Sequence, residues 1–498
     1  MGTASVPKRT WHRYIWDTFD KSPEERRFLF KLDMALLTFA TLGYFVKTLD
    51  QNNINSAFVS GMKEDLGLYK NELNYMQACW TVGYALGEIP SNVLLTRIRP
   101  RYWLPTMEII WTILTLSLSK CHTPDQIYIL RFFIGLSEST FYPGMQYIIG
   151  SWYRKDELAK RSCVFQASGA IATMLSGCIM TGAYKLRGVG GFKGWQWLFL
   201  IDGIISLPIG VLGFFLLPDV PEIANPWYLS QQEVALARQR MRLEGRNGRE
   251  PFSRAKLKKI LSSWHLPLLV MMYLKPEPLA VPYHPSQFFS TSTNPKYSVP
   301  NINLYPSGTS AIQVVTTLAY AWLSDSAFGG RRWPPILCGG IVDLACAVPL
   351  AVWNISAAGK WTCYILWGAG YGLSGLCLAL VEQARQNTVL LLIMLLRETN
   401  SWAQEICSND NEERALVVAT MNTMSHVFQA WLPQIVWQQV DAPKYRSGFI
   451  SCAGMAIGLL CMVGVVRWKQ KQTEHDDRGS ATAGGLDRET EDVDKREQ

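Results

Sequence analysis

Ionisable side chains inside long apolar stretches are the residues of this sequence whose type and spacing could do chemistry. Arg131 and Glu138 lie seven residues apart, a spacing of two helical turns that places both on one helix face. An ionisable group in hydrocarbon costs about 2.5 to 3.5 kcal/mol, so it usually faces a cavity or a partner. Arg131 is predicted to attract a carboxylate, and Glu138 to carry a coupled proton. The alternative is an ion pair of Arg131 with Glu138 or Asp50 that fixes helix packing.

Further acids lie in other apolar stretches. Asp50, together with Lys47, is predicted to close the first stretch at a depth similar to that of Arg131. Asp202 and Asp343 are buried acids in later stretches, and pairing between helices is as good an explanation as proton binding. We take Asp50 and Asp202, with Glu138, as the predicted proton-coupling residues. Glu88 is expected to have a structural role.

Polar and aromatic residues supply the predicted substrate-binding set. Asn422, His426 and Gln429 follow helical spacing in a late apolar stretch, and they could face a cavity. Trp80 and Tyr142 could line a pocket with Arg131, although most aromatic residues of such stretches pack or lie at the membrane interface. The predicted binding residues are Arg131, Tyr142, Trp80, Asn422 and Gln429.

Motifs of enzymes and of cofactor sites do not fit this sequence. The segment Gly368–Gly375 contains G-x-G-x-x-G, but it lies in an apolar helix with no preceding strand, so close helix packing explains it better. The 11 cysteines include no C-x-x-C pair, and no Walker A, G-x-S-x-G or H-E-x-x-H motif is present. We therefore expect no enzyme activity, no metal and no cofactor, and a transporter driven by an ion gradient.

The elements that must position these residues are membrane helices. Hydrophobic residues make up 48% and charged residues only 18% of 498 residues. Stretches of about 20 apolar residues can cross the hydrocarbon layer, and they must be helical there. The predicted spans are 33–50, 75–95, 103–119, 127–150, 164–184 and 195–217, then 265–274, 310–322, 335–353, 361–381, 415–440 and 449–468.

The organisation predicted from these spans is two six-helix halves joined by a basic linker. The net charge of +8 resides in the short connections, which is a membrane-orientation pattern and not a nucleic-acid surface. Basic even-numbered connections place both termini in the cytoplasm, and Asn354, in Asn-Ile-Ser, on the outer side as a glycosylation candidate. The predicted parts are a cytoplasmic N-terminal segment 1–32, the halves 33–217 and 264–468, the cytoplasmic linker 218–263 and a disordered cytoplasmic tail 469–498.

Local motifs carry a resemblance to the major facilitator superfamily. The segment SDSAFGGRRWP is similar to its cytoplasmic loop signature, in which Asp325, Arg331 and Arg332 would lock neighbouring helices. The matching segment TRIRPRYWLP of the first half keeps the basic residues but lacks the acid. The resemblance implies an all-α membrane protein of about twelve helices, with its site between the two halves.

Longer segments are similar to the fungal allantoate permease or anion:cation symporter family, specifically its pantothenate transporter-like branch. They are YFVKTLDQNNINSAFVSGMKEDLGL, GYALGEIPSNVLLTRIRPRYWLP, RFFIGLSESTFYPGMQYIIGSWY and NEERALVVATMNTMSHVFQAWLPQIVWQQVDAPKY. The resemblance implies proton-coupled uptake of a small organic anion by a monomer in the plasma membrane. A pantothenate-like monocarboxylate is expected, with allantoate, nicotinate or another carboxylate as alternatives. The expected partners are this anion, protons and the lipid bilayer.

Two segments depart from that family. The seventh span offers only WHLPLLVMMYL before a charged, proline-containing run, and an unusual insertion occupies 382–401. Gene-model or splicing errors are one interpretation, which sequencing the transcript tests, and natural divergence is the other. Export of a fungal metabolite, a nutrient sensor and a variant made non-functional by an incomplete seventh helix remain the alternative functions.

Overall fold

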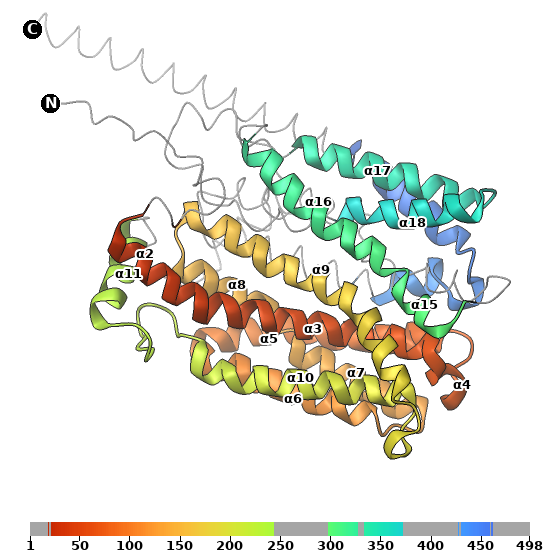
Figure 1. Cartoon of the computed structure of the whole chain (residues 1–498), viewed down its shortest axis with the longest axis horizontal. Helices are drawn as coiled ribbons and strands as arrows, with labels where there is room; N and C mark the ends of the chain where they lie inside the picture. The colour runs from red at the N-terminus through yellow and green to blue at the C-terminus, as the bar shows by residue number, and fades with distance from the viewer. Residues whose placement is uncertain are drawn as a thin grey trace, which may run out of the picture.

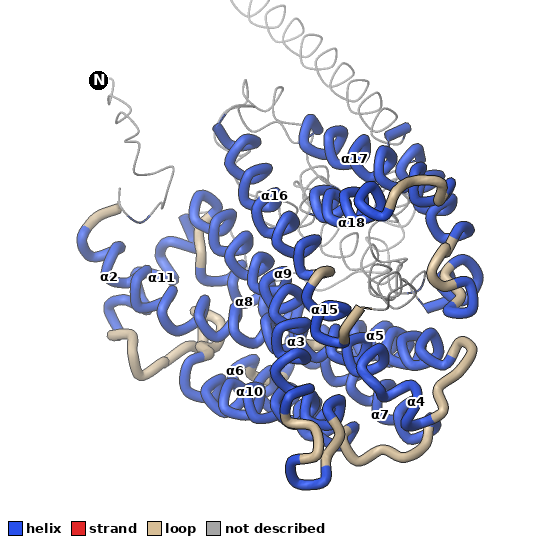
Figure 2. The backbone as a smooth tube through the Cα atoms, turned by 45° about the vertical axis from the view of Figure 1, so that its right-hand side comes forward, coloured by secondary structure: helices blue, strands red, loops and turns tan. Residues whose placement is uncertain are grey.

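The computed structural model describes residues 18, 21–243, 297–326, 333–371, 427, 430–458 and 460–461. Within these residues every regular element is a helix, and short loops join consecutive helices (Figure 2). The first group of helices comprises α2 (Pro23–Leu32), α3 (Thr38–Ala57), α4 (Lys63–Leu66), α5 (Glu72–Arg97), α6 (Pro100–Leu118), α7 (Pro124–Glu138), α8 (Phe141–Trp152), α9 (Lys155–Lys185), α10 (Gly194–Leu216) and α11 (Gln231–Leu243). The second comprises α15 (Val299–Leu304), α16 (Ser307–Ser326), α17 (Trp333–Val352) and α18 (Ala357–Tyr371).

Most predicted spans of the described ranges coincide with a helix, so the all-α fold is confirmed. In the part of the chain that the structure describes, three helices are long and apolar enough to cross a membrane by length and composition: Pro23–Leu66, Val164–Lys185 and Gly194–Leu216. The short seventh span at 265–274 and the insertion at 382–401 lie outside the described residues. The predicted count of twelve spans and the predicted domain boundaries therefore stay predictions.

The end of the first predicted span, 33–50, differs from the end of the helix in the structure. The prediction that Lys47 and Asp50 close this helix is wrong, because α3 continues to Ala57, and the helix breaks only at Ser60 and Gly61, whose dihedral angles are not helical. The polar residues after Asp50 look like the end of a membrane span. In the folded chain they stay helical, because their side chains find hydrogen-bond partners on neighbouring helices.

The fourth predicted span, 127–150, is interrupted and not continuous. Helix α7 ends at Glu138 and α8 begins at Phe141, while Ser139 keeps helical dihedral angles. Pro143 lacks the N–H group that would bond the carbonyl of Ser139, so a local kink follows. The kink lies directly after Glu138.

Glycines bring the helices of the first group into backbone contact. A Cβ on Gly83 would lie 2.1 Å from the carbonyl oxygen of Phe132, and a Cβ on Gly135 would lie 2.1 Å from that of Trp80. Only glycine fits these positions, so α5 and α7 pack at the closest possible distance. In the second group Gly368 packs in the same way against α16, as the sequence analysis predicts for that glycine.

The two groups of helices meet near α4 and α15, which lie at the same end of the molecule (Figure 1). We call this the α4 end. Asn74 at the start of α5 donates to the carbonyls of Pro433 (3.3 Å) and Trp437 (3.0 Å). Asn303 of α15 donates to the hydroxyl of Ser60 at 2.9 Å. At the α4 end, direct hydrogen bonds therefore close the first group of helices against α15 and residues 433–437.

The opposite end, where α2 and α11 lie, is held by ion pairs (Figure 1). Arg161 donates to both carboxylate oxygens of Asp33, at 2.7 and 2.8 Å. Glu157 accepts from Lys21 at 3.0 Å and from Arg240 of α11. Helix α11, which lies in the predicted linker 218–263, thus docks on α9 through charged side chains.

Candidate functional site

A polar turn of α3, residues 50–53, is the centre of the candidate site. The Asp50 carboxylate accepts a hydrogen bond of 2.5 Å from the hydroxyl of Thr115 on α6. The next residue, Gln51, donates from Nε2 to Oε2 of Glu138 on α7 at 3.0 Å. Consecutive helical side chains point about 100° apart, so one turn reaches several neighbouring helices. This explains how a polar sequence is accommodated inside the bundle.

The second half of the same turn reaches α9 and α10. Asn52 donates to the hydroxyl of Thr173 at 3.1 Å, and Asn53 accepts from the hydroxyl of Ser176 at 3.0 Å. Asp202 of α10, a predicted proton-coupling residue, lies beside Asn53 and is 1% exposed. Helices α6, α7, α9 and α10 therefore all contact one turn of α3 or the acids next to it.

Arg131 lies fully buried where α5 and α7 are in backbone contact. Its Nη2 donates to Oε1 of Gln77 at 3.2 Å, and Gln77 donates in turn to Oδ1 of Asn55 at 3.0 Å. The guanidinium carbon lies 5.8 Å from the centre of the Trp80 ring, which confers a cation–π contact. The sequence analysis placed Trp80 with Arg131, and the structure brings these two residues together.

The guanidinium group of Arg131 has unused hydrogen-bonding capacity. Its Nε and Nη1 atoms have no hydrogen-bond partner among the described residues. Glu138 and Asp50 act on Arg131 through space, but within the described ranges neither is at ion-pair distance from it. One oxygen of each of these two carboxyl groups is likewise buried without a partner there. The alternative of a packing ion pair does not match this geometry.

Acids outnumber bases around this site. Lys47 is 5% exposed, and its Nζ lies 4.8 Å from the centre of the Tyr84 ring. It interacts electrostatically with Glu138 and Glu88. Among the described residues, four buried carboxyl groups, those of Asp50, Glu88, Glu138 and Asp202, thus accompany two buried cations, Lys47 and Arg131. Counted over these six residues alone, the charges do not balance when every carboxyl group is ionised.

The remaining predicted residues fall elsewhere or outside the described residues. The hydroxyl of Tyr142 accepts from Nε2 of Gln166 at 2.6 Å, and its ring packs 5.6 Å from that of Tyr44 and 5.9 Å from that of Phe165. This aromatic cluster connects α3, α8 and α9, and no described contact joins it to Arg131. Asn354 is exposed in the loop between α17 and α18. The side chains of Asp325, Arg331, Arg332, Asn422, His426 and Gln429 lie outside the described residues.

Glu108 of α6 is a buried acid that the sequence analysis did not single out. It is 0% exposed, and neither carboxyl oxygen has a hydrogen-bond partner among the described residues. The signal was present, because an acid in the apolar stretch 103–119 is costly and calls for an explanation.

Known proteins are similar to this chain in sequence and in fold. Residues 40–394 match the Major Facilitator Superfamily. The chain is 33% identical over 446 residues to the pantothenate transporter liz1 of Schizosaccharomyces pombe, with 89% of this chain and 80% of that protein covered. It is 31% identical to the pantothenate transporter FEN2 of Saccharomyces cerevisiae, with 87% and 82% covered. The proton:xylose symporter XylE bound to 6-bromo-6-deoxy-D-glucose superposes with a TM-score of 0.62 at 13% identity, covering 87% of this chain and 94% of that one.

The helical bundle, its buried charges and these matches define a multi-pass integral membrane protein of the secondary transporter class. The chain belongs to the Major Facilitator Superfamily, and it is similar to fungal pantothenate transporters.

Proposed function

We propose that this chain imports a pantothenate-like monocarboxylate together with protons across the plasma membrane. The similarity to two fungal pantothenate transporters supports the substrate class. The expected partners are this anion, protons and lipid, and we expect the transporter to act as a monomer. The observation that carries the proposal is the buried guanidinium group of Arg131, which has two nitrogen atoms without a hydrogen-bond partner among the described residues.

Arg131 binds the carboxylate of the substrate in this proposal. A buried charge with no partner is costly, and a hydrogen-bonded carboxylate compensates it. Either nitrogen, Nε or Nη1, supplies a donor for such a group, while Gln77 and the Trp80 ring hold the guanidinium in place. Asn422 and Gln429 remain further proposed binding residues.

Glu138, Asp50 and Asp202 carry the coupled protons in this proposal. Carboxyl groups outnumber cations among the described residues of the site, and bound protons balance the charge of these residues in this proposal. An arriving carboxylate adds one more negative charge beside Arg131, which strengthens that requirement. Co-transport of an anion with protons is the consequence.

The closed α4 end is the outer side in this proposal, and both termini are cytoplasmic. The halves are 33–217 and 264–468, with the linker 218–263 on the inner side. The exposed loop with Asn354 then faces outward, where the sequence Asn-Ile-Ser is a glycosylation site. Loss of a glycan-dependent mobility shift in Asn354→Gln supports this orientation. Unchanged migration of the wild-type protein after enzymatic deglycosylation argues against it.

The test is uptake of labelled pantothenate at acidic and neutral pH in yeast that lacks its own carrier. We expect acid-stimulated uptake by the wild-type chain, and its loss in Arg131→Ala and in Glu138→Gln. The exposed residues Arg187 and Glu64 provide the controls Arg187→Ala and Glu64→Gln, which should transport normally. Normal uptake by Arg131→Ala would contradict the proposal, and efflux without uptake would favour the exporter alternative.

A further inference from the structure

Glu88 of α5 is a buried acid to which the proposed function gives no role. Its side chain is 2% exposed, and Lys47 of α3 interacts electrostatically with both Glu88 and Glu138. The Nζ of Lys47 lies 4.8 Å from the centre of the Tyr84 ring and 5.9 Å from that of the Tyr44 ring. One buried lysine on α3 therefore faces two carboxyl groups that come from two other helices.

Hydrogen bonds between α3 and α5 fix the order of these groups along the bundle. Gln77 donates to Asn55 at 3.0 Å, so these two residues lie at one level near the α4 end, where α3 ends and α5 begins. Gln51 and Lys47 lie four and eight residues before Asn55, and Glu88 lies eleven residues after Gln77. At about 1.5 Å per residue, these three residues lie roughly 6, 12 and 16 Å nearer the opposite end, which we call the α2 end.

Glu88 and Glu138 lie on two helices whose backbones are in contact. A Cβ on Gly87, which precedes Glu88, would lie 2.4 Å from the Oγ of Ser139, which follows Glu138. The hydrogen bond to α3 described above holds the Glu138 carboxyl group at the level of the turn 50–53. Lys47 therefore lies between the two acids, with the Glu138 carboxyl group toward the α4 end and Glu88 toward the α2 end.

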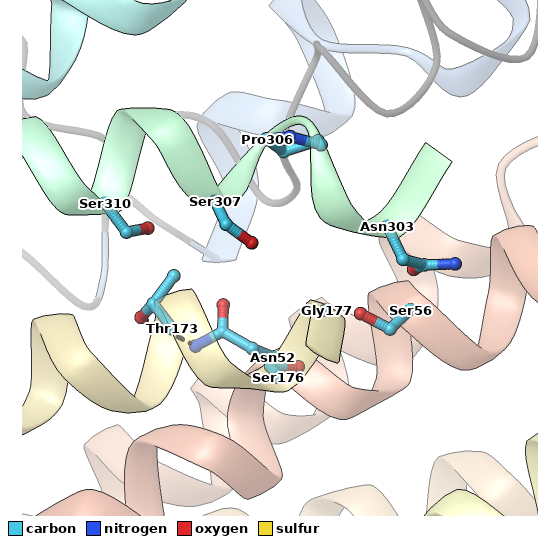
Figure 3. A pocket seen from close by; sticks show the side chains of 9 residues that line it. All are labelled: Asn52, Ser56, Thr173, Ser176, Gly177, Asn303, Pro306, Ser307 and Ser310. Carbon is cyan, nitrogen blue, oxygen red and sulfur yellow. Dashed lines mark hydrogen bonds between the residues drawn. The ribbon is translucent and has the colours of Figure 1, made fainter. Parts of the chain in front are cut away.

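The side of α3 that faces α9 and α16 leaves little room for a water-filled route (Figure 3). Asn52 donates to Thr173 across this side at 3.1 Å, and the cavity that remains measures about 10 Å³. This volume is about what one water molecule needs. A proton released by Glu138 is therefore not conducted along this side, and the face with Lys47 and Glu88 is the other polar direction.

The charges of Lys47 and the two acids allow a proton to move between the acids. One ammonium group balances one carboxylate, so with these three groups counted by themselves the second acid carries a proton. The net charge is the same whether Glu138 or Glu88 holds this proton. Arg131 and Asp50 act on Glu138 as well, with opposite signs.

We infer that Glu88 is the inner proton acceptor of the transport cycle, and that Lys47 is a positioning residue that pairs with whichever of the two acids is ionised. The O–H bond of Glu138 breaks, water carries the proton, and an O–H bond forms on the Glu88 carboxylate. Glu88 then releases the proton at the α2 end. This inference rests on the proposed function, from which it takes proton coupling and the cytoplasmic position of the α2 end.

The test separates substrate exchange from proton-driven accumulation, with the full chain in proteoliposomes and labelled pantothenate as the probe. Exchange of external labelled against internal unlabelled pantothenate needs no net proton transfer, whereas accumulation driven by a proton gradient does. Glu88→Gln should keep the exchange rate within about twofold and slow accumulation about a hundredfold, because a positioned proton-transfer group contributes at least about that factor. Glu88→Asp keeps a carboxyl group and should accumulate more than Glu88→Gln.

Two comparisons make the result specific. Glu108 is also a buried acid, and it contacts no described cation, so Glu108→Gln is the matched control and should keep both exchange and accumulation. Lys47→Gln tests the link between the two residues. Combined with Glu88→Gln, it should lower accumulation no further than Glu88→Gln alone, because both substitutions act on one step.

The outcomes separate this inference from the proposed function. Loss of exchange together with accumulation in Glu88→Gln would assign Glu88 to helix packing and overturn the inference. Unchanged accumulation in Glu88→Gln, an equal loss in Glu108→Gln, or losses of the Lys47 and Glu88 variants that multiply would overturn it as well. The proposed function stands in these cases. A wild-type chain that exchanges pantothenate without accumulating it would overturn the proposed proton coupling, and absence of exchange would overturn the proposed substrate.

Discussion

Gly177 of α9 sits where the two groups of helices come closest, and adding one methyl group there should hold them apart. A Cβ on Gly177 would lie 2.1 Å from the carbonyl oxygen of Asn303 and 2.9 Å from its carbon. Carbon and oxygen atoms in contact seldom approach within about 3.4 Å, so α15 must move by roughly 1.3 Å in Gly177→Ala. Backbone atoms and not a flexible side chain oppose the methyl group. The closed α4 end is therefore the state that the substitution penalises.

The size of the effect follows from the cost of overpacking. Inserting a methyl group into a packed contact costs about 1 to 3 kcal/mol, which shifts a two-state equilibrium about 5- to 150-fold. We expect Gly177→Ala to populate the state open at the α4 end by that factor. Fold stability should change less, because the methyl group meets only the opposite group of helices.

The assay follows the reactivity of one cysteine introduced at Ser56, a buried residue of α3 on the side that faces Asn303, after the 11 native cysteines are replaced. A membrane-impermeant maleimide added outside the cell should label it faster in Gly177→Ala than in the parent. Gly182 of the same helix has nothing within 4 Å of its Cβ position, so Gly182→Ala is the matched control and should label at the parent rate. Equal labelling rates in the two variants would refute the reasoning.

Three further substitutions test other contacts. Asn74→Leu removes two hydrogen bonds to carbonyls of residues 433–437, so it should raise labelling from outside through a loss of about 1 to 3 kcal/mol. Arg161→Met leaves Asp33 without its bidentate partner and should lower the free energy of unfolding in detergent by about 3 to 5 kcal/mol; an unchanged melting temperature would contradict this. Glu108→Gln keeps the shape of a side chain that contacts no described cation, so the pH profile of uptake should not change; a shifted profile would place Glu108 among the proton carriers.

The fold could be predicted from the sequence wherever an apolar stretch was long and ended in charges. Helix α10 matches its predicted span 195–217 to within a residue, because both ends carry strong polar signals. The end of α3 was predicted wrongly for the same physical reason. A polar run normally indicates a segment exposed to water, but here Gln51 and Asn52 form hydrogen bonds to side chains of α7 and α9. Hydropathy indicates which residues avoid water, but it takes no account of hydrogen-bond partners that only the folded chain provides.

The candidate site was likewise predictable from the sequence only where its residues lie on one helix. The seven-residue spacing of Arg131 and Glu138 was enough to place both on α7, where the structure buries them. Gln77 and Thr173 could not be predicted, because they meet α3 from helices distant in sequence. Tyr142 was predicted to line the pocket, but its ring packs with those of Tyr44 and Phe165, a contact between helices that the sequence alone does not reveal.

The turn 50–53 gives a physical reason why substrate and proton should be coupled without touching. Asn52 lies where α3 faces α9 and α16, and its neighbour Gln51 holds Glu138. Within one helical turn neither residue can move without the other, because both are fixed to the same hydrogen-bonded backbone. If substrate binding shifts this turn, the hydrogen bond to Glu138 lengthens and the cost of ionising that carboxyl group changes. The coupling free energy is then set by the rigidity of α3, and it is reciprocal, so protonation of Glu138 must equally change the affinity for the substrate.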